Sequence, residues 1–405
     1  MTAEQATTIF FLFAVGACIG SFINVAVWRL PRGESIVTPP SHCPKCDHRL
    51  AWRDNLPVVG WIMLAGKCRY CGQKISPRYP IVEFLCGALF ALFYAAIFVF
   101  HQGPFIAEYW HGSLISLRRM DDIARDWPIF GLYLATIGVL LAVSLIDADF
   151  YTIPTYPVWG LAALAILVHT LVDRPDLPGN VLATPGAMAL AAGGAVGLLV
   201  SIALLELGLL PLSFAEGESA LEIDKDRPPE EQQAPEYAPW QIRVEMAKEV
   251  LFLLPPFFLA GLSEFLAMNS ASVHHFWQWA GGQYWLSGLM GALMGGLAGG
   301  LTVWITRILG SFGFGKEAMG LGDIHLMFGI GSVIGAGAAV VTFFLAPFFG
   351  IAMAVYLFLA RRRRQLPFGP YLSMSAGFVM LFYFPIYDRL RPGLVALRYV
   401  LRTLL

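Results

Sequence analysis

The chain has 405 residues, of which 57% are hydrophobic and 14% charged, and its mean hydropathy is +0.64. Because too few polar side chains remain to cover a soluble globule of this length, most of the chain is expected to lie in lipid. The formal net charge of -1 argues against a nucleic-acid-binding protein, which needs a basic face, so no nucleic-acid partner is expected.

The first apolar segment, residues 9–28, is predicted to be a transmembrane helix within residues 1–28. Only Glu4 precedes it as a charge, and Arg29 and Arg32 follow it directly. Positive side chains after a span favour the cytoplasm for that end. A secretory signal peptide would carry its basic residues before the apolar core and a small-residue cleavage site after it. The segment is therefore interpreted as a retained helix with its N-terminus outside.

Residues 29–80 form a polar block with two C-x-x-C pairs, CPKC at 43–46 and CRYC at 68–71, separated by 21 residues (47–67). Such pairs offer four thiolates to a tetrahedral ion. The spacing predicts a small cytoplasmic zinc-ribbon-like domain with structural zinc on Cys43, Cys46, Cys68 and Cys71. Two disulfides or a redox pair are the alternatives, although a reducing cytoplasm disfavours disulfides. His42 and His48 are near enough to substitute as ligands, but surface histidines there are more often bystanders.

Further apolar runs follow, most of them long enough for the roughly 20 residues that a span needs. They cover residues 81–100, 129–146, 156–171, 187–210, 250–268, 285–309, 336–360 and a last run near 371–385. The pattern predicts an all-α polytopic membrane protein with about 8–10 transmembrane helices, ten if the short run 324–335 crosses. This count places residues 361–364 in the cytoplasm. It also places the arginines of the C-terminal tail outside, against the positive-inside expectation, so the placement of the tail stays open.

Two polar interruptions are longer than tight loops. Residues 101–128 are expected to form an external loop. Residues 211–247 carry eight acidic side chains between Glu216 and Glu236 against two basic ones, together with several prolines. So little apolar surface can be buried there that disorder is expected, with an acidic docking segment as the alternative.

Carboxylates stand at the ends of two apolar runs. Asp147 and Asp149 close one run shortly before Pro154, and Asp323 follows the glycine-rich stretch AMGLG at 318–322. An ionisable group at a membrane span is costly and suggests a function. The topology above places both sites at the cytoplasmic boundary of their spans, so the carboxylates are expected to meet.

Two carboxylates within hydrogen-bonding reach share a proton, so that one can act as a base toward water. This is the chemistry of an aspartic protease. Gly320 and Gly322 suit a substrate-binding role, because a backbone without Cβ can approach an extended peptide closely and turn sharply. The alternative for Asp323 is a helix N-cap, which is a common role for aspartate.

Six motifs resemble, in their order, those of the bacterial type IV prepilin peptidases. They are GSFINVAVWRLP at 20–31, the two C-x-x-C pairs, RYPIVE at 78–83, IDADFYTIP at 146–154, AMGLGDIHL at 318–326 and PFGPYLSMSA at 367–376. The resemblance implies a polytopic inner-membrane aspartic protease with a G-x-G-D motif. Such an enzyme cleaves the basic leader from prepilins or pseudopilins of type IV pilus and type II secretion systems. Bifunctional members also N-methylate the new terminal residue with S-adenosylmethionine as methyl donor.

The resemblance assigns the catalytic carboxylates to Asp147 and Asp323. Side chains two positions apart on a helix point about 200° away from each other, so Asp147 and Asp149 cannot both face one partner. Asp149 is the reserve candidate. The implied partners are prepilin or pseudopilin substrates and membrane lipid. The implied location is the bacterial inner membrane, with the catalytic face in the cytoplasm.

The sequence departs from the family pattern at Thr155, where Asp or Asn is frequent, and at His325, where Lys is usual. An inserted helix pair at 184–268 also separates the two motifs, and an even number of added crossings preserves the sidedness of Asp323. The predicted domains are therefore the first helix, the zinc domain, helices with the first aspartate at 81–183, the insertion at 184–268 with its acidic loop, and helices with the G-x-G-D motif at 269–405.

Two other classes of protein remain as alternatives. A proton or ion transporter could use intramembrane aspartates, and a non-catalytic membrane scaffold could use the zinc domain to recruit partners. The overlapping G-x-x-x-G patterns formed by Gly291, Gly295 and Gly299 are interpreted as close packing of membrane helices.

Overall fold

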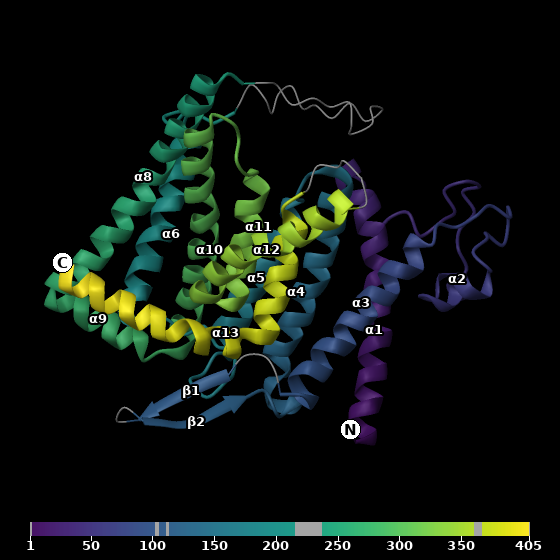
Figure 1. The fold of residues 1–405 in the computed structure, drawn as a ribbon, viewed down its shortest axis with the longest axis horizontal. Helices are drawn as coiled ribbons and strands as arrows, with labels where there is room; N and C mark the ends of the chain where they lie inside the picture. The colour runs from purple at the N-terminus through teal and green to yellow at the C-terminus, as the bar shows by residue number, and fades with distance from the viewer. Residues whose placement is uncertain (1, 102–104, 111–112, 215–236, 360–366, 405) are drawn as a thin grey trace. The chain divides into compact units, whose positions relative to one another are not determined.

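The structure, a computed structural model, describes all residues except 1, 102–104, 111–112, 215–236, 360–366 and 405. The described residues are almost entirely helical (Figure 1). Among these described residues, eight helical segments are long and apolar enough to cross a membrane. The chain is therefore a multi-pass membrane protein, and the predicted all-α polytopic fold is confirmed.

The helices and strands follow one another in a simple order. They are α1 (Ala3–Arg29), η1 (Leu30–Arg32), η2 (Trp52–Asn55), α2 (Val59–Met63), α3 (Arg78–Tyr94), the π-helical turn η3 (Ala95–Val99), β1 (Phe105–Trp110), β2 (Ser113–Arg119), α4 (Ile123–Phe150), α5 (Thr155–Val172), α6 (Pro185–Glu206), α8 (Pro239–Asn269), α9 (Ala271–Gly281), α10 (Tyr284–Phe314), α11 (Leu321–Ile334), α12 (Ala336–Leu359) and α13 (Gly369–Leu404). They divide into two compact units. One holds residues 1–148, 176–179 and 373–405, and the other holds residues 149–175 and 180–372.

In the first unit, α1 and α3 pack closely because small residues line their crossing. A Cβ added to Gly16 would lie 2.9 Å from the Cα of Gly87, and one added to Gly20 would lie 2.7 Å from the Cα of Glu83. Only glycine permits so close an approach of two helix backbones. The close contact fixes α3 against α1 on either side of the cysteine-containing segment.

In the second unit, α10 and α11 approach even more closely. A Cβ on Gly295 would collide with the carbonyl oxygen of Gly331, and a Cβ on Gly331 would collide with that of Gly295. Gly299 meets the carbonyl of Met327 in the same way. The G-x-x-x-G pattern therefore serves helix packing, as predicted.

Two polar segments differ from the sequence predictions. The expected external loop at 101–128 contains an antiparallel hairpin of β1 and β2, and α4 already begins at Ile123. The acidic segment predicted to span 211–247 ends earlier, because α8 begins at Pro239. Its residues 215–236 lie outside the described residues, as do residues 361–364, for which the sequence predicts a cytoplasmic location.

Two further helical features were not predicted. A short helix, α9, separates α8 from α10. The last helix, α13, continues to Leu404 but has non-helical dihedral angles at Phe382 (φ -114°, ψ 25°). A break at this position allows the second half of α13 to take a different direction from the first half.

Candidate functional site

The four predicted metal ligands lie on two turns with the same hydrogen-bond pattern. In the first turn, the N–H of Cys43 donates to the His48 carbonyl and the N–H of Asp47 donates to the Cys43 carbonyl. In the second turn, Cys68 takes the place of Cys43, with Gln73 and Gly72 at the equivalent offsets. Asp47 and Gly72 both have positive φ, 54° and 69°, which the tight return of each turn requires.

The cysteine side chains converge as a metal site requires. All four Sγ atoms lie within 4.8 Å of one another, and those of Cys43 and Cys71 are 3.9 Å apart. A tetrahedral site with metal–sulfur bonds of about 2.3 Å needs sulfur atoms about 3.8 Å apart. No disulfide joins any two of these four cysteines in the structure. The cluster fits a metal ion.

The turn geometry also favours thiolate at one ligand. Backbone N–H groups of Cys71 and Tyr70 point at the Cys68 sulfur and lower the pKa of this thiol to about 7, because they stabilise its charged form. A thiolate is the species that binds a metal ion. The neighbouring histidine rings have other contacts. His48 stacks on Tyr70 with ring centroids 3.6 Å apart, and Nδ1 of His42 lies 3.1 Å from the Pro40 carbonyl oxygen.

A cavity of about 520 Å³ lies beside the cluster, lined among others by Asn24, Trp28, Trp61, Cys43 and Glu83. This volume lies within the usual range for small-molecule sites. Glu83 accepts the backbone N–H of Val58 at 2.6 Å, which ties α3 to the segment between the two turns.

One ion pair and one buried arginine fix the backbone of the cysteine-containing segment. The Asp54 carboxylate receives three bonds from the Arg69 guanidinium at 2.7 to 3.1 Å, which lowers the pKa of Asp54. Arg29 donates to the carbonyls of Ser35 and Pro39 at 3.0 and 2.7 Å. It therefore shapes the start of the domain, in addition to any role as an orientation signal.

Asp147 lies in the last turn of α4 with 6% of its surface exposed. Asp149 is half-buried and is the next to last residue of α4. The chain then passes through Ile153 to Pro154, which is the N-cap of α5. Of the two aspartates in this motif, Asp147 is the more deeply buried.

Asp323 lies in the first turn of α11 with 7% of its surface exposed. The N-cap of this helix is Gly320 (φ -73°, ψ 153°). Asp323 is therefore the third helical residue rather than the cap, contrary to the capping alternative. Asp147 belongs to the first compact unit and Asp323 to the second, and each is described within its own unit.

The two glycines of the G-x-G-D motif have different surroundings. A Cβ on Gly322 would lie 2.8 Å from the Cβ of Ile153. A Cβ on Gly320 would meet only Oδ2 of Asp323 at 3.7 Å and the N of Gly322 at 3.9 Å. Gly322 is therefore required by packing, whereas Gly320 has free space beside it. A substrate-binding role for either glycine stays a prediction.

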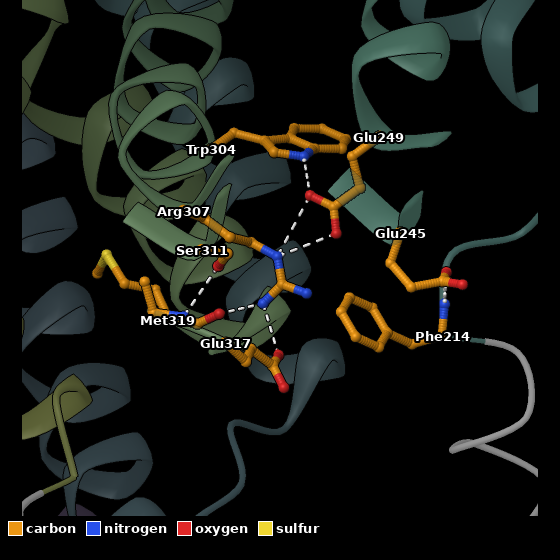
Figure 2. Close-up of polar contacts among 9 residues, drawn as sticks. Phe214, Glu245, Glu249, Trp304, Arg307, Ser311, Glu317 and Met319 are labelled. Atoms are coloured by element: carbon orange, nitrogen blue, oxygen red, sulfur yellow. Dashed lines mark hydrogen bonds and ion pairs between the residues drawn. The ribbon is translucent and has the colours of Figure 1, made fainter. Parts of the chain in front are cut away.

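A buried polar network beside this motif was missed by the sequence analysis. It joins Glu249 of α8, Arg307 of α10 and the segment that precedes α11 (Figure 2). The rule that drew attention to the aspartates, an ionisable group at an apolar run, also applies to Glu249, which directly precedes the run 250–268, and to Arg307, which lies within the run 285–309. The sequence pattern does not show that these two residues, 58 positions apart, contact each other.

Residues 14–97 match the family model described as the bacterial peptidase A24 N-terminal domain. The chain is similar to a prepilin leader peptidase/N-methyltransferase of Myxococcus xanthus, with 54% identity over 20% of this chain and 24% of that protein. For one of Klebsiella pneumoniae the identity is 49%, over 20% of this chain and 39% of that protein. The type 4 prepilin-like proteins leader peptide-processing enzyme of Escherichia coli is 34% identical over 34% of this chain and 48% of its own length.

These matches span less than half of each of the three relatives. No solved structure matches the chain. The resemblance to prepilin peptidases that the sequence motifs indicated is confirmed by the family model and by these relatives.

Proposed function

We propose that the protein is a membrane aspartic endopeptidase that cleaves the leader peptide of type IV prepilins or pseudopilins and N-methylates the new terminal residue. The observation that carries the proposal is the similarity of its N-terminal part to proteins named as prepilin leader peptidase/N-methyltransferases. All the relatives named above are processing enzymes. This supports an enzyme over the transporter and scaffold alternatives.

The local surroundings of the two aspartates support their proposed role. Both are buried at a helix end, Asp147 in the last turn of α4 and Asp323 in the first turn of α11. Within the second unit, Ile153 packs on Gly322. Ile153 lies six residues after Asp147 in the chain, and Gly322 directly precedes Asp323. This contact, within the second unit, holds the end of the first motif against the start of α11.

In the proposed reaction, Asp147 and Asp323 share one proton. The ionised carboxylate accepts a proton from water, and the water oxygen attacks the carbonyl carbon of the peptide bond that follows the leader glycine. The protonated carboxyl group hydrogen-bonds to the carbonyl oxygen as negative charge develops there. Transfer of a proton to the leaving nitrogen then releases the amine of the mature protein and the carboxylate of the leader.

The proposed location is the inner membrane, with the catalytic face toward the cytoplasm. Arg29 and Arg32 at the end of the first span support this orientation. The positive end of a leader would then stay in the cytoplasm while the apolar helix of the pilin remains in the bilayer. Cleavage at that boundary requires carboxylates at helix ends rather than in the middle of a span.

The Cys43, Cys46, Cys68 and Cys71 cluster is proposed to hold zinc in a structural role. Four thiolates leave no open coordination position for catalysis, so hydrolysis remains with the aspartates. When bound, S-adenosylmethionine supplies the methyl group for the new terminal amine. The cavity beside the cluster has a volume suited to a small-molecule ligand. We propose that this domain organises contacts with the leader or with the methyl donor.

The test uses detergent-solubilised protein, a prepilin and a labelled methyl donor, followed by mass analysis of the product N-terminus. Asp147→Asn and Asp323→Asn are expected to abolish cleavage while leaving the protein inserted and folded. Asp149→Asn is the matched control and is expected to retain cleavage. Processing that persists in the Asp323→Asn protein would exclude the proposed pair. Supplying peptide that is already cleaved measures methylation separately.

A further inference from the structure

Arg307 of α10 forms a buried ion pair with Glu249 of α8 (Figure 2). Nε of Arg307 donates to both oxygens of the Glu249 carboxylate at 3.0 and 3.2 Å. The indole Nε1 of Trp304, on the preceding turn of α10, donates to Oε2 of the same carboxylate at 2.9 Å. The side chains of Arg307 and Glu249 are 0% and 2% exposed. The pair is therefore shielded from solvent.

The same guanidinium also holds the segment that precedes α11. Nη1 of Arg307 donates to Oε1 of Glu317 at 2.6 Å and to the carbonyl oxygen of Met319. Between these residues, the backbone N–H of Ala318 donates to Oγ of Ser311 on α10 at 2.9 Å. Figure 2 shows these bonds on one side of the guanidinium and Glu249 on the other. Three consecutive residues are thus fastened to α10.

The fastened segment leads directly into the helix that carries Asp323. Gly320, the residue after Met319, is the N-cap of α11, and Asp323 lies in the first turn. The rigidity of a hydrogen-bonded helix means that a displacement of its cap moves the side chains of its first turn. The contacts of Met319 therefore hold the backbone at the start of α11, the turn on which Asp323 lies.

A contact that served only to pack α8 on α10 would be complete with the Glu249–Arg307 pair. Instead, Nε is used for Glu249 and Nη1 for the segment before α11. Nη2 is buried without a hydrogen-bond partner among the described residues, and the guanidinium carbon lies 5.3 Å from the ring centroid of Phe214. Only a planar, forked donor can serve the two partners at once.

We propose that Arg307 and Glu249 are positioning residues that hold residues 317–320, and through them Asp323, in the geometry for peptide cleavage. This inference rests on the proposed function, because it assigns Asp323 to catalysis. It also assigns a role to α8. This helix lies in the segment 184–268 that the sequence analysis interprets as an insertion, and through Glu249 it supports the helix that bears the catalytic carboxylate.

The first test compares Arg307→Lys and Glu249→Gln with the wild-type protein in prepilin cleavage. A lysine keeps the charge but offers one nitrogen, which cannot serve Glu249 and Met319 in the same geometry. We expect kcat to fall by about 100-fold, as for other small displacements of a reacting group, while KM stays within about twofold because leader contacts are retained. Glu245→Gln is the matched control. Glu245 lies one turn before Glu249 and binds the Phe214 N–H at 2.7 Å, so its variant is expected to keep the wild-type kcat.

The second test separates positioning from simple helix packing. The double variant Glu249→Arg, Arg307→Glu restores an ion pair between α8 and α10, but a glutamate at position 307 cannot donate to the Met319 carbonyl. We expect this double variant to unfold at the same temperature as the wild-type protein but to cleave prepilin no faster than Arg307→Lys does. Recovery of both would show a purely structural pair and would overturn the proposal.

Glu317→Gln provides a variant that is expected to fold, because the Glu317 side chain is 50% exposed. It weakens only the bond on the side of α11 and is expected to lower kcat at an unchanged unfolding temperature. A wild-type kcat in folded Arg307→Lys and Glu317→Gln proteins would overturn the positioning role. If the wild-type protein itself cleaves none of the prepilins, the proposed function fails instead, so the two failures are distinguishable.

Discussion

Gly322 packs directly against Ile153, with 2.8 Å between the Cβ of Ile153 and the point where a Cβ on residue 322 would stand. This contact joins the segment after Asp149 to the helix that carries Asp323. At 2.8 Å, a real Cβ would force one of the two segments to move. By contrast, Gly320 has room for a methyl group, and the two glycines can therefore be tested against each other.

The Gly322→Ala protein is expected to be less stable than the wild type by about 1–3 kcal/mol, the usual cost of overpacking. Gly320→Ala is expected to fold with wild-type stability. If Gly320 contacts the substrate backbone, its variant should nevertheless cleave prepilin more slowly. Thermal unfolding in detergent and a cleavage assay measure the two effects. Equal stability losses in both proteins would contradict the difference in packing.

Replacement of Gly295 tests the contact between α10 and α11. A methyl group there collides with a backbone carbonyl, that of Gly331, which no side-chain rotation can relieve. The Gly295→Ala protein should lose stability at the upper end of about 1–3 kcal/mol. Gly313 lies on the same helix with nothing within 4 Å of its would-be Cβ. Gly313→Ala should instead stabilise the helix by up to about 1 kcal/mol, and thermal unfolding of the two variants should shift in opposite directions.

Metal binding to the four cysteines is expected to weaken steadily as the pH falls. The pKa of the Cys68 thiol is lowered from 9.0 to about 7, whereas that of the Cys46 thiol is raised to about 12, so a metal ion must displace protons from the cluster throughout the neutral range. Apparent affinity should then fall by about tenfold per pH unit for each proton displaced. Competition with a chromogenic chelator over about 2.5 pH units, roughly pH 5.5–8, measures how the apparent metal affinity depends on pH.

Matched cysteine variants define the zinc stoichiometry. Cys68→Ser should abolish tight zinc binding, whereas Cys18→Ser, on α1 outside the cluster, should retain one zinc ion per chain. An affinity that does not change with pH, or zinc retained at full occupancy by the Cys68→Ser protein, would contradict a thiolate site.

The Asp54–Arg69 pair should protect the segment that carries the four cysteines in a pH-dependent way. The Arg69 guanidinium lowers the pKa of Asp54 below its ordinary 3.8, so the stabilisation is fully present above pH 3.8 and is lost as the pH falls through the lowered pKa. At neutral pH, Asp54→Asn should increase amide hydrogen exchange in η2, while Glu34→Gln should leave it unchanged. Unchanged exchange in Asp54→Asn would show that the pair contributes nothing to local stability.

The long apolar helices and the metal ligands were predictable from the sequence because each depends on local pattern. Span length follows from hydropathy, and two C-x-x-C pairs specify a tetrahedral ligand set. The positions of Asp147 and Asp323 at helix ends also followed, because Pro154 and the glycines at 320 and 322 mark the boundaries. The alternative that Asp323 is the N-cap of this helix was wrong, since Gly320 occupies that position.

Other features depend on contacts between distant segments and could not be read from local pattern. Glu249 borders one apolar run and Arg307 lies within another, but nothing in either run specifies the other residue as its partner. The same holds for Ile153 and Gly322. Arg29 matched the pattern of an orientation signal, yet its bonds to Ser35 and Pro39 show a structural use that a charge count does not reveal.

The two cysteine turns are closed by their own backbone hydrogen bonds, with a third equivalent bond from Leu50 to Ser41 and from Ile75 to Gly66. Each turn is therefore complete before any ion arrives. We expect the ion to join two turns that are already folded, rather than to induce their folding. Removal of the metal should free residues 51–65, between the turns, to move while both turns persist, so that the metal can leave and rebind without unfolding of the membrane helices.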